Sequence, residues 1–383
     1  RQRPPGIAGM LVEGPSSAAW RGRSALLVEE LARQVHRDGG HEERSPMYHA
    51  ALEEGLLDVL NLCRARPERA PSGLVPALEA AIARMQRALE ILTLSDGRIA
   101  LFADAAFDIA PEPHALRDYA ARVGVPLATA EAFAGSARLE QTGYVRLERG
   151  EWMLLASVAG PAPAHQPGHA HCDALAFELS LAGRRLVADT GVFEYRAGPR
   201  RERSRATASH ATIQVDEEEQ AEIWSAHRVG GRPEVVLLPG GDAGVAEATC
   251  RGWSRPQTLH RRRYRVGEGG VEIEDSIEGP ARILHARLPL EPGWSVELCS
   301  GDPGEAVRDG ESGSGASPSR SSAICRHRAE PELRVEIELP AAFAWHVEEG
   351  AYHPTFGREL ARPVLVGVGR ACTAARTRIR RVG

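Results

Sequence analysis

Side chains suited to catalysis or metal binding are concentrated between His165 and His210. Three histidines, His165, His169 and His171, lie within seven residues, and Asp189 ends an apolar run. His171, Asp189 and His210 fall at the ends of successive expected strands, so an antiparallel sheet could bring two imidazoles and a carboxylate together. Such a ligand set is typical of zinc. The alternative is that these are ordinary polar residues whose hydrogen bonds are satisfied by the backbone.

The two neighbouring histidines have different expected roles. In extended chain His169 and His171 share a face because Ala170 lies between them, so one could bind metal while the other faces a substrate. An imidazole that titrates near neutrality is a suitable general acid or base, which makes His169 a catalytic candidate. His165, in an Ala- and Pro-rich segment, is expected to be a solvated loop residue.

Arginines crowd the segment between Asp189 and His210. They are Arg196, Arg200, Arg201, Arg203 and Arg205. A solvated basic loop is the ordinary explanation for such a run. Beside the histidines, however, it could frame a site for an anion, since guanidinium groups bind carboxylate and sulfate through paired hydrogen bonds. We expect no nucleic-acid partner, because the formal net charge is -5 and only 5% of the residues are aromatic.

A second polar cluster occupies residues 41–49, at the expected start of a helix. Ser45 is placed to cap this helix and Pro46 to begin its first turn. The preceding loop and the first turn carry His41, Glu42, Glu43, Arg44, Tyr48 and His49. Capping requires only Ser45 and one acid, so the other side chains indicate binding or catalysis. The helix N-terminus would itself favour an anion nearby.

Two patterns of apolar residues divide the chain. Up to about residue 125 they recur at helical spacing. This predicts helices over 17–37, 46–63, 74–92 and 113–123. After Gly135 they alternate with a period of two, and turns recur at regular intervals without long helices between them, which predicts a large antiparallel β-sandwich. The expected fold class is therefore α+β and multidomain, with helical hairpins over 1–125 and the sandwich over 126–383.

The composition is that of a globular protein of 383 residues, 43% of them hydrophobic and 26% charged. No run of about eighteen apolar residues is present, so no membrane span is expected. The six cysteines form no CxxC pair, which argues against a zinc ribbon and a disulfide scaffold. Because the chain begins at Arg1 without a leader-like segment, we expect a mature form or a fragment of a longer protein.

Two pairs of segments carry a family resemblance. GHAHCDALAFELSLAGRRLVADTGVFEY and RSRATASHATIQVD resemble the C-terminal half of the heparinase II/III-type polysaccharide lyases. DGGHEERSPMYHAALEEGLLDVLNL and DGRIALFADAAF are similar to the end of their helical toroid. The resemblance covers residues 15–230. It implies the end of an incomplete α/α toroid followed by an antiparallel β-sandwich, with the active site in the cleft between them.

By this resemblance the chain would cleave an acidic, uronic-acid-containing polysaccharide by β-elimination. Such a site must neutralise the uronate carboxylate, remove the C5 proton and protonate the leaving oxygen. His41 and Glu43 would hold the carboxylate. His169 would act as base or acid, with Tyr195 or Tyr48 as its partner in proton transfer. Other polar residues of the two clusters are candidates for substrate binding, namely Arg44, His49, Arg200, Arg203 and Arg205.

The resemblance also implies that His171, Asp189 and His210 bind a structural zinc ion, which orders the loop carrying the catalytic groups. The chain departs from the family's usual pattern at two places. Ala211 follows His210 where members read His-Asn-Thr, and the segment SDGRIALFADAAF lacks the family's tyrosine. Either Tyr195 or Tyr48 takes that role, or the activity is altered or absent.

Two other functions are compatible with the sequence. The main alternative is a non-catalytic protein of the same fold that binds an acidic polysaccharide during exopolysaccharide production. A hydrolase that uses zinc-bound water has only the ligand set in its favour. The family resemblance places the protein in the periplasm or the cell envelope, with the cytoplasm as the alternative.

Overall fold

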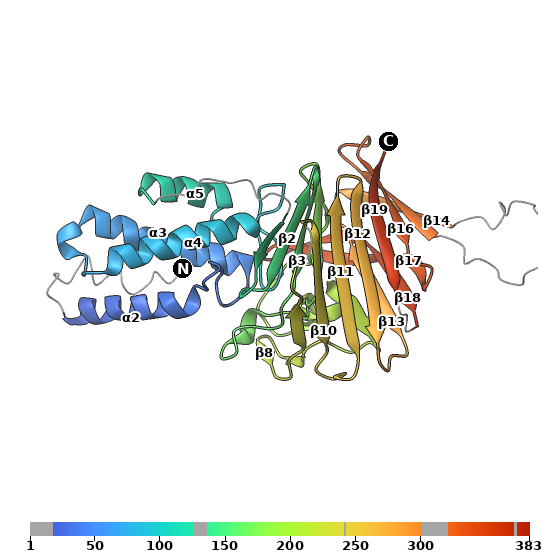
Figure 1. The fold of residues 1–383 in the computed structure, drawn as a ribbon, viewed down its shortest axis with the longest axis horizontal. Helices are drawn as coiled ribbons and strands as arrows, with labels where there is room; N and C mark the ends of the chain where they lie inside the picture. Colours follow the sequence, from blue (N-terminus) through green and yellow to red (C-terminus); the bar gives the residue numbers. More distant parts are fainter. Residues whose placement is uncertain (1–17, 126–135, 241–242, 301–320, 371–373) are drawn as a thin grey trace, which may run out of the picture.

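The computed structural model describes residues 18–125, 136–240, 243–300, 321–370 and 374–383. A group of helices lies at one end of the molecule and large antiparallel sheets lie at the other (Figure 1). The helices of this group are α2 (Ala18–Gln34), α3 (Pro46–Ala65), α4 (Leu74–Ile91) and α5 (Pro113–Arg122), and a further short helix, α6 (Pro199–Arg205), falls among the strands in chain order. Short 3-10 helices are η1 (Pro67–Arg69), η2 (Pro167–His169) and η3 (Thr207–Ser209). The expected combination of N-terminal helices with antiparallel sheets is confirmed.

The four predicted helices are all present, with ends within a few residues of the expected positions. Ser45 caps α3 as predicted, because its side chain accepts a hydrogen bond from the backbone N–H of Tyr48 at 3.3 Å. The helices pack through their apolar faces, which bury Leu57 on α3 and Ile82 on α4 completely. Most of their stability comes from this packing rather than from intrinsic propensity. None of the helices described by the structure combines the length and apolar character needed to cross a membrane.

Every strand pairing in the three larger sheets is antiparallel. The five-stranded sheet runs in order through β1 (Ser136–Leu139), β2 (Tyr144–Arg149), β3 (Trp152–Ser157), β4 (Phe177–Leu181) and β5 (Arg184–Val187). The four-stranded sheet has the order β17-β18-β13-β6 and contains β6 (Ile213–Val215), β13 (Leu284–Pro289), β17 (Phe343–Thr355) and β18 (Arg358–Gly369). A separate hairpin consists of β7 (Ile223–Trp224) and β8 (Arg228–Val229).

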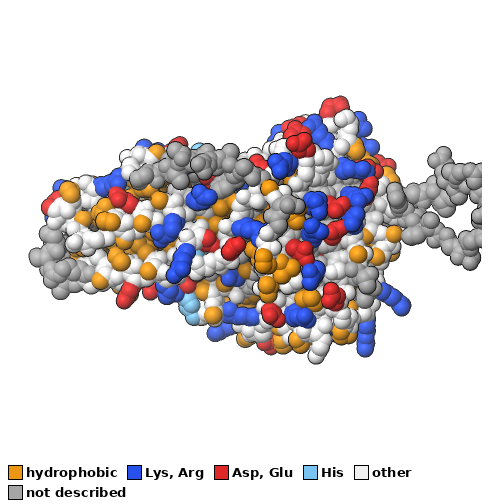
Figure 2. Space-filling model, in the orientation of Figure 1, with side chains coloured by type: hydrophobic (Ala, Val, Ile, Leu, Met, Phe, Trp, Pro, Cys, Tyr) orange, Lys and Arg blue, Asp and Glu red, His pale blue; other side chains and the backbone are white. Residues whose placement is uncertain are grey.

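The eight-stranded sheet has the order β14-β15-β16-β19-β12-β11-β10-β9. Its strands are β9 (Glu234–Leu237), β10 (Val245–Arg251), β11 (Leu259–Gly267), β12 (Gly270–Glu278), β14 (Trp294–Ser300), β15 (Ser321–His327), β16 (Arg334–Leu339) and β19 (Ala375–Val382). One hydrophobic core joins all three sheets, with Leu154, Tyr264 and Leu365 as members from the five-, eight- and four-stranded sheets. The opposite, solvated face carries interspersed arginines and acids (Figure 2).

The helical and sheet parts are joined by buried charge. Arg185 on β5 is 5% exposed and donates to Glu178 Oε2 at 2.7 Å and to the carbonyl of Ile99 at 3.0 Å. The other carboxylate oxygen of Glu178 accepts the backbone N–H of Leu101 at 2.7 Å. Burial raises the pKa of Glu178 to about 7, although Arg185 opposes the shift. These contacts fix the segment after α4 against the five-stranded sheet.

We expect Arg185→Ala to be strongly destabilising, because it leaves Glu178 buried without its partner. The free energy of unfolding, measured by chemical denaturation, should fall by about 3–5 kcal/mol. The adjacent Arg184 is the matched control, since its partner Glu330 is exposed and Arg184→Ala removes only a surface ion pair. Similar unfolding curves for the two variants would contradict the role given to Arg185.

Candidate functional site

The two polar clusters of the sequence meet beside His169, on η2. Its Nδ1 lies 2.9 Å from Oε2 of Glu43, in the loop before α3. Tyr48, in the first turn of α3, stacks on the imidazole with ring centroids 4.1 Å apart and an interplanar angle of 12°. The backbone N–H of Asp104 donates to the carbonyl of His169 at 2.9 Å, which holds η2 against the helical part. The folded chain therefore brings an acid, an imidazole and a phenol into direct contact.

A second phenol completes this group. The hydroxyl oxygens of Tyr48 and Tyr195 lie 2.8 Å apart, so one donates a hydrogen bond to the other. Tyr195 packs edge-on against Phe356, with ring centroids 4.9 Å apart. Burial raises the pKa of Tyr48, and it raises the pKa of Tyr195 well above the ordinary tyrosine value. Both phenols consequently keep their protons at neutral pH, so each hydroxyl can act as a hydrogen-bond donor.

His41 and Arg44 flank the group in the same loop. His41 is 7% exposed, and burial lowers its pKa to about 4, with Glu43 opposing the shift. Its imidazole is therefore neutral at physiological pH and can offer a hydrogen bond but no positive charge. Arg44 is half-buried and donates to the carbonyl of Gly160 at 2.7 Å, so its guanidinium is partly engaged by the backbone.

Two residues predicted to bind substrate are buried instead, and that prediction is wrong for both. His49 is 1% exposed on the inner face of α3, with Nε2 3.0 Å from the carbonyl oxygen of Met85. Arg205 is also 1% exposed. It donates hydrogen bonds to the backbone carbonyls of Ala170, Ser225 and Arg228. In each case at least one side-chain nitrogen pairs with a backbone carbonyl that would otherwise be buried without a partner.

Arg200 and Arg203 lie on the surface of α6, as a rim for an anion would require. Arg200 Nε is 3.6 Å and Arg203 Nη1 is 3.9 Å from Oε2 of Glu359. The Arg200 guanidinium also stacks 4.4 Å above the ring of Phe193. Both arginines are exposed, so an anionic ligand would compete with Glu359 for them.

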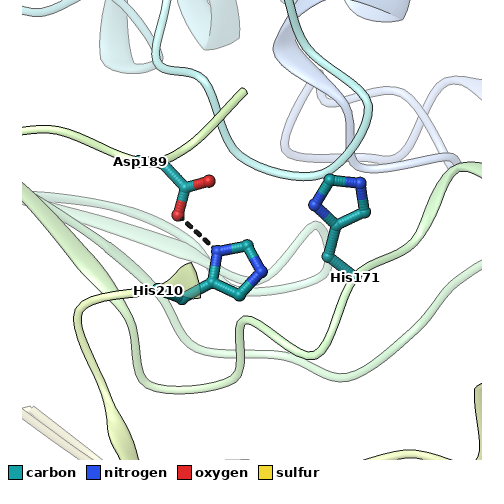
Figure 3. Close-up of side chains that lie close together, drawn as sticks. All are labelled: His171, Asp189 and His210. Atoms are coloured by element: carbon teal, nitrogen blue, oxygen red, sulfur yellow. Dashed lines mark hydrogen bonds and ion pairs between the residues drawn. The ribbon is translucent and has the colours of Figure 1, made fainter. Parts of the chain in front are cut away.

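His171, Asp189 and His210 converge in the interior, and each offers a ligand atom within 4.8 Å of the others (Figure 3). His210 Nδ1 lies 2.7 Å from Asp189 Oδ2. Nδ1 of His171 and Nε2 of His210 are buried and have no hydrogen-bond partner among the described residues. An unpaired buried nitrogen is costly, and a cation held by these two atoms would remove that cost. The donor set thus fits a metal ion such as zinc.

Asp104 and Arg201 support this site. The sequence indicates Arg201 only as a member of the basic segment and does not indicate Asp104. Both side chains are completely buried, and Arg201 donates through both terminal nitrogens to the two Asp104 oxygens, with Nη2 2.8 Å from Oδ2. Asp104 Oδ1 also lies 2.8 Å from His171 Nε2. Since carboxylates hold one nitrogen of each histidine, the other nitrogen of each faces the candidate metal position. The only feature of the sequence that could have indicated Asp104 is its position as an acid within an apolar segment.

His227 is a further residue that no local motif revealed. It lies in the turn between β7 and β8 and is exposed. Its ring is edge-on to those of Tyr195 and His169, with centroid separations of 5.6 and 6.4 Å. His227 Nδ1 lies 3.3 Å from the carbonyl oxygen of Gly168 on η2. A third part of the chain therefore borders the group around His169.

Residues 133–375 match the family model described as Heparinase II/III-like, C-terminal. FtsZ-localized protein C of Caulobacter vibrioides is 29% identical over 334 residues, which cover 80% of this chain and 54% of that protein. A solved heparinase III aligns with 98% of this chain and 58% of its own, at a TM-score of 0.71 and 18% identity. The heparan sulfate lyase of Pedobacter heparinus aligns over the same shares, at a TM-score of 0.70 and 19% identity.

The chain thus spans little more than half the length of these relatives. The low identity to the solved lyases means that they show the fold and not the activity. The family model, by contrast, covers more than half of the 383 residues, and this chain belongs to the heparinase II/III-like family.

Proposed function

We propose that this chain is part of a polysaccharide lyase that cleaves an acidic, uronic-acid-containing polysaccharide by β-elimination. The observation that carries the proposal is the contact of Glu43, His169, Tyr48 and Tyr195 in a member of the heparinase II/III-like family. Elimination needs a base for the C5 proton and an acid for the leaving oxygen. A hydrogen-bonded imidazole and a pair of protonated phenols can supply both.

His169 is the proposed base. Its Nδ1 donates to Glu43, which leaves Nε2 as the unprotonated nitrogen that can accept the C5 proton. Burial alone would raise the pKa of Glu43, but the hydrogen bond from His169 lowers it, so Glu43 stays ionised. An ionised Glu43 stabilises the imidazolium that forms as the proton is taken up.

Tyr48 and Tyr195 form the proposed acid. Their raised pKa values keep both phenols protonated, so no phenolate is present to act as a base, and a phenol can donate its proton to the departing O4 oxygen. The hydrogen bond between the two hydroxyls would let the second phenol reprotonate the first. This pair would replace the tyrosine that the segment SDGRIALFADAAF lacks.

His41, Arg44, Arg200 and Arg203 are the proposed contacts to the substrate carboxylate. His41 would act as a neutral hydrogen-bond donor, and the two arginines of α6 would supply positive charge. In this proposal helices α2–α5 are the end of an α/α toroid within residues 1–125. Residues 126–383 form the sandwich domain, the substrate lies in the cleft between the two, and the protein acts in the periplasm or the cell envelope.

The proposed metal is one structural zinc ion, held by His171, His210 and Asp189. When bound, it would order the chain segments that position His169. Asp189 binds Nδ1 of His210 through Oδ2 and accepts the N–H of Thr190 through Oδ1 at 2.8 Å. It can therefore orient His210 as well as approach the ion.

A second candidate function is binding of an acidic polysaccharide without cleavage. The absence of a tyrosine in SDGRIALFADAAF favours it, because this segment then supplies no proton-transfer group. Its acid at the site, Asp104, is already paired with Arg201. The name FtsZ-localized protein C also describes where that relative is found and not an enzymatic activity. The two candidates share the binding surface and differ in whether proton transfer occurs.

Lyase activity can be tested with the complete protein and a panel of uronate polymers, by following the absorbance of the unsaturated product. We expect His169→Ala and Tyr195→Phe to lower kcat by about 10²-fold or more, since each removes a proton-transfer group. The control is His346→Ala, because His346 is an exposed histidine paired with Glu348 at 2.7 Å on the surface. Binding without new absorbance on any polymer would favour the second candidate and exclude the lyase.

Metal content tests the zinc proposal. We expect purified wild-type protein to contain about one zinc ion per chain, and His210→Ala to lose it, because that variant removes one of the two free nitrogens. His260→Ala is the matched control, since His260 is a buried histidine that faces Asp275 at 2.6 Å away from the proposed site. Zinc lost equally from both variants would indicate general destabilisation rather than a lost ligand.

Protonation of His41 should make stability depend on pH. Its pKa is about 4 in the folded protein and 6.5 as the reference for the unfolded chain, so only the unfolded state binds the proton between these values. Wild-type stability should therefore fall on acidification from pH 7 to pH 5 by about 2 kcal/mol more than that of His41→Gln. Chemical denaturation at the two pH values measures the difference. Parallel pH dependence in both proteins would show that His41 is not held neutral by burial.

A further inference from the structure

Two tryptophans beside the candidate site are exposed. Trp224, on β7, has 51% of its surface accessible, and Trp253, in the loop after β10, has 40%. Among the described residues they are the only tryptophan, tyrosine or phenylalanine side chains that are exposed. Tryptophan is usually buried because of its large apolar area, so a pair left in solvent indicates a binding surface.

The backbone between the two rings holds them in place. A Cβ atom on Gly230 would lie 3.0 Å from Cζ3 of Trp224, and one on Gly231 would lie 2.5–3.0 Å from three ring atoms of Trp253. The absence of side chains at this Gly-Gly pair therefore lets both indoles approach the same stretch of chain. The backbone N–H of Trp253 also donates to the backbone carbonyl of Gln220 at 3.0 Å. This bond holds the loop that carries Trp253 against the chain just before β7.

The same hairpin reaches the group around His169. His227, in its turn, contacts Gly168 on η2 and faces the ring of Tyr195 edge-on. Only two residues separate it from Trp224, so the hairpin that carries the exposed indole also borders the site. The hairpin β7-β8 lies at the lower edge of the sheets (Figure 1).

A positive charge accompanies the rings. Arg228 is exposed and is the direct cross-strand partner of Trp224, and side chains so paired lie close enough to contact one ligand. The apolar C–H face of a pyranose ring packs well on an indole. A guanidinium beside it can pair with a carboxylate or sulfate of that ring. The carboxylate of Glu222 lies on the same hairpin, where its Oε2 accepts the backbone N–H of Gly231 at 2.9 Å. Arg228 is therefore the side chain of this surface that can pair with an anionic group of a sugar stacked on the indoles.

We propose that Trp224 and Trp253 form a saccharide-stacking subsite, in which they bind pyranose rings of an acidic polysaccharide while Arg228 pairs with its carboxylate or sulfate. The subsite rests on the proposed function, because it would hold the same polysaccharide that reaches His169. It binds the polymer next to the reacting sugar and takes no part in proton transfer. The subsite should therefore contribute the same binding free energy in the ground state and in the transition state. Its loss is expected to weaken substrate binding and raise KM without lowering kcat.

Calorimetric titration of the complete protein with a uronate oligosaccharide, with a neutral dextran oligosaccharide for comparison, tests the subsite. We expect Trp224→Ala/Trp253→Ala to weaken binding of the uronate about tenfold, equivalent to about 1.4 kcal/mol, and Trp224→Phe/Trp253→Phe to recover part of the loss. Arg228→Gln should weaken binding of the uronate and leave the dextran signal unchanged. The control is Val236→Ala, which alters an exposed apolar residue on β9.

The outcomes separate the subsite from the lyase reaction. Cleavage by the wild type with an unchanged KM in the double alanine variant would overturn the subsite and leave the lyase proposal standing. Binding without cleavage, weakened in the double variant, would support the subsite and exclude the lyase. A wild type that neither binds nor cleaves any uronate would overturn both. Equal losses in the Val236→Ala control would also overturn the subsite, since they would show that the effect is not specific to the indoles.

Discussion

The buried ion pair between Asp104 and Arg201 is the interaction on which the geometry of the site depends. Both side chains are fully buried, and two charges removed from water are tolerated only when each is extensively paired. Arg201 also donates to the carbonyls of Gly168 at 3.1 Å and Ala226 at 2.8 Å. One guanidinium therefore ties the segment after α4 to η2, to α6 and to the turn of the β7-β8 hairpin.

The neighbours of this ion pair are the residues with proposed functions. His169 follows Gly168, His227 follows Ala226, and Asp104 itself holds the Nε2 side of His171. Burial alone would raise the pKa of Asp104, but the hydrogen bond from His171 and the charge of Arg201 lower it, so the carboxylate stays ionised. Loss of either partner would leave an uncompensated charge at the point where these four chain segments meet, and two of them, η2 and the turn of the β7-β8 hairpin, carry a histidine of the site.

Local features were predictable from the sequence, whereas partners distant in the chain were not. The cap at Ser45 depends on a short-range rule, and the structure confirms it. Strand β17 lacks a regular apolar alternation, because most of its first half is exposed. The contact between the two polar clusters followed from the family resemblance and not from any periodicity.

The wrong predictions at the site concern polar side chains that the tertiary fold buries. His49 and Arg205 carry the side chains expected of a ligand-binding surface, yet both satisfy backbone carbonyls in the interior. Arg201 was grouped with its neighbours as part of a basic loop and is completely buried. Sequence spacing shows which residues share a short segment, but it does not show which of them the tertiary fold requires as hydrogen-bond donors.

The supply of positive charge is what separates a lyase from a binding protein on this scaffold. Removal of the C5 proton builds negative charge onto the adjacent carboxylate, and any lyase must stabilise it. Burial keeps His41 neutral, and Arg201 is committed to Asp104. Arg200 and Arg203 are exposed cations that could respond, since each side chain is more than half exposed and their nearest nitrogens lie 3.6 and 3.9 Å from Oε2 of Glu359. Surface pairs of this kind are worth little, so a substrate carboxylate could displace Glu359 at small cost and acquire the charge that elimination requires.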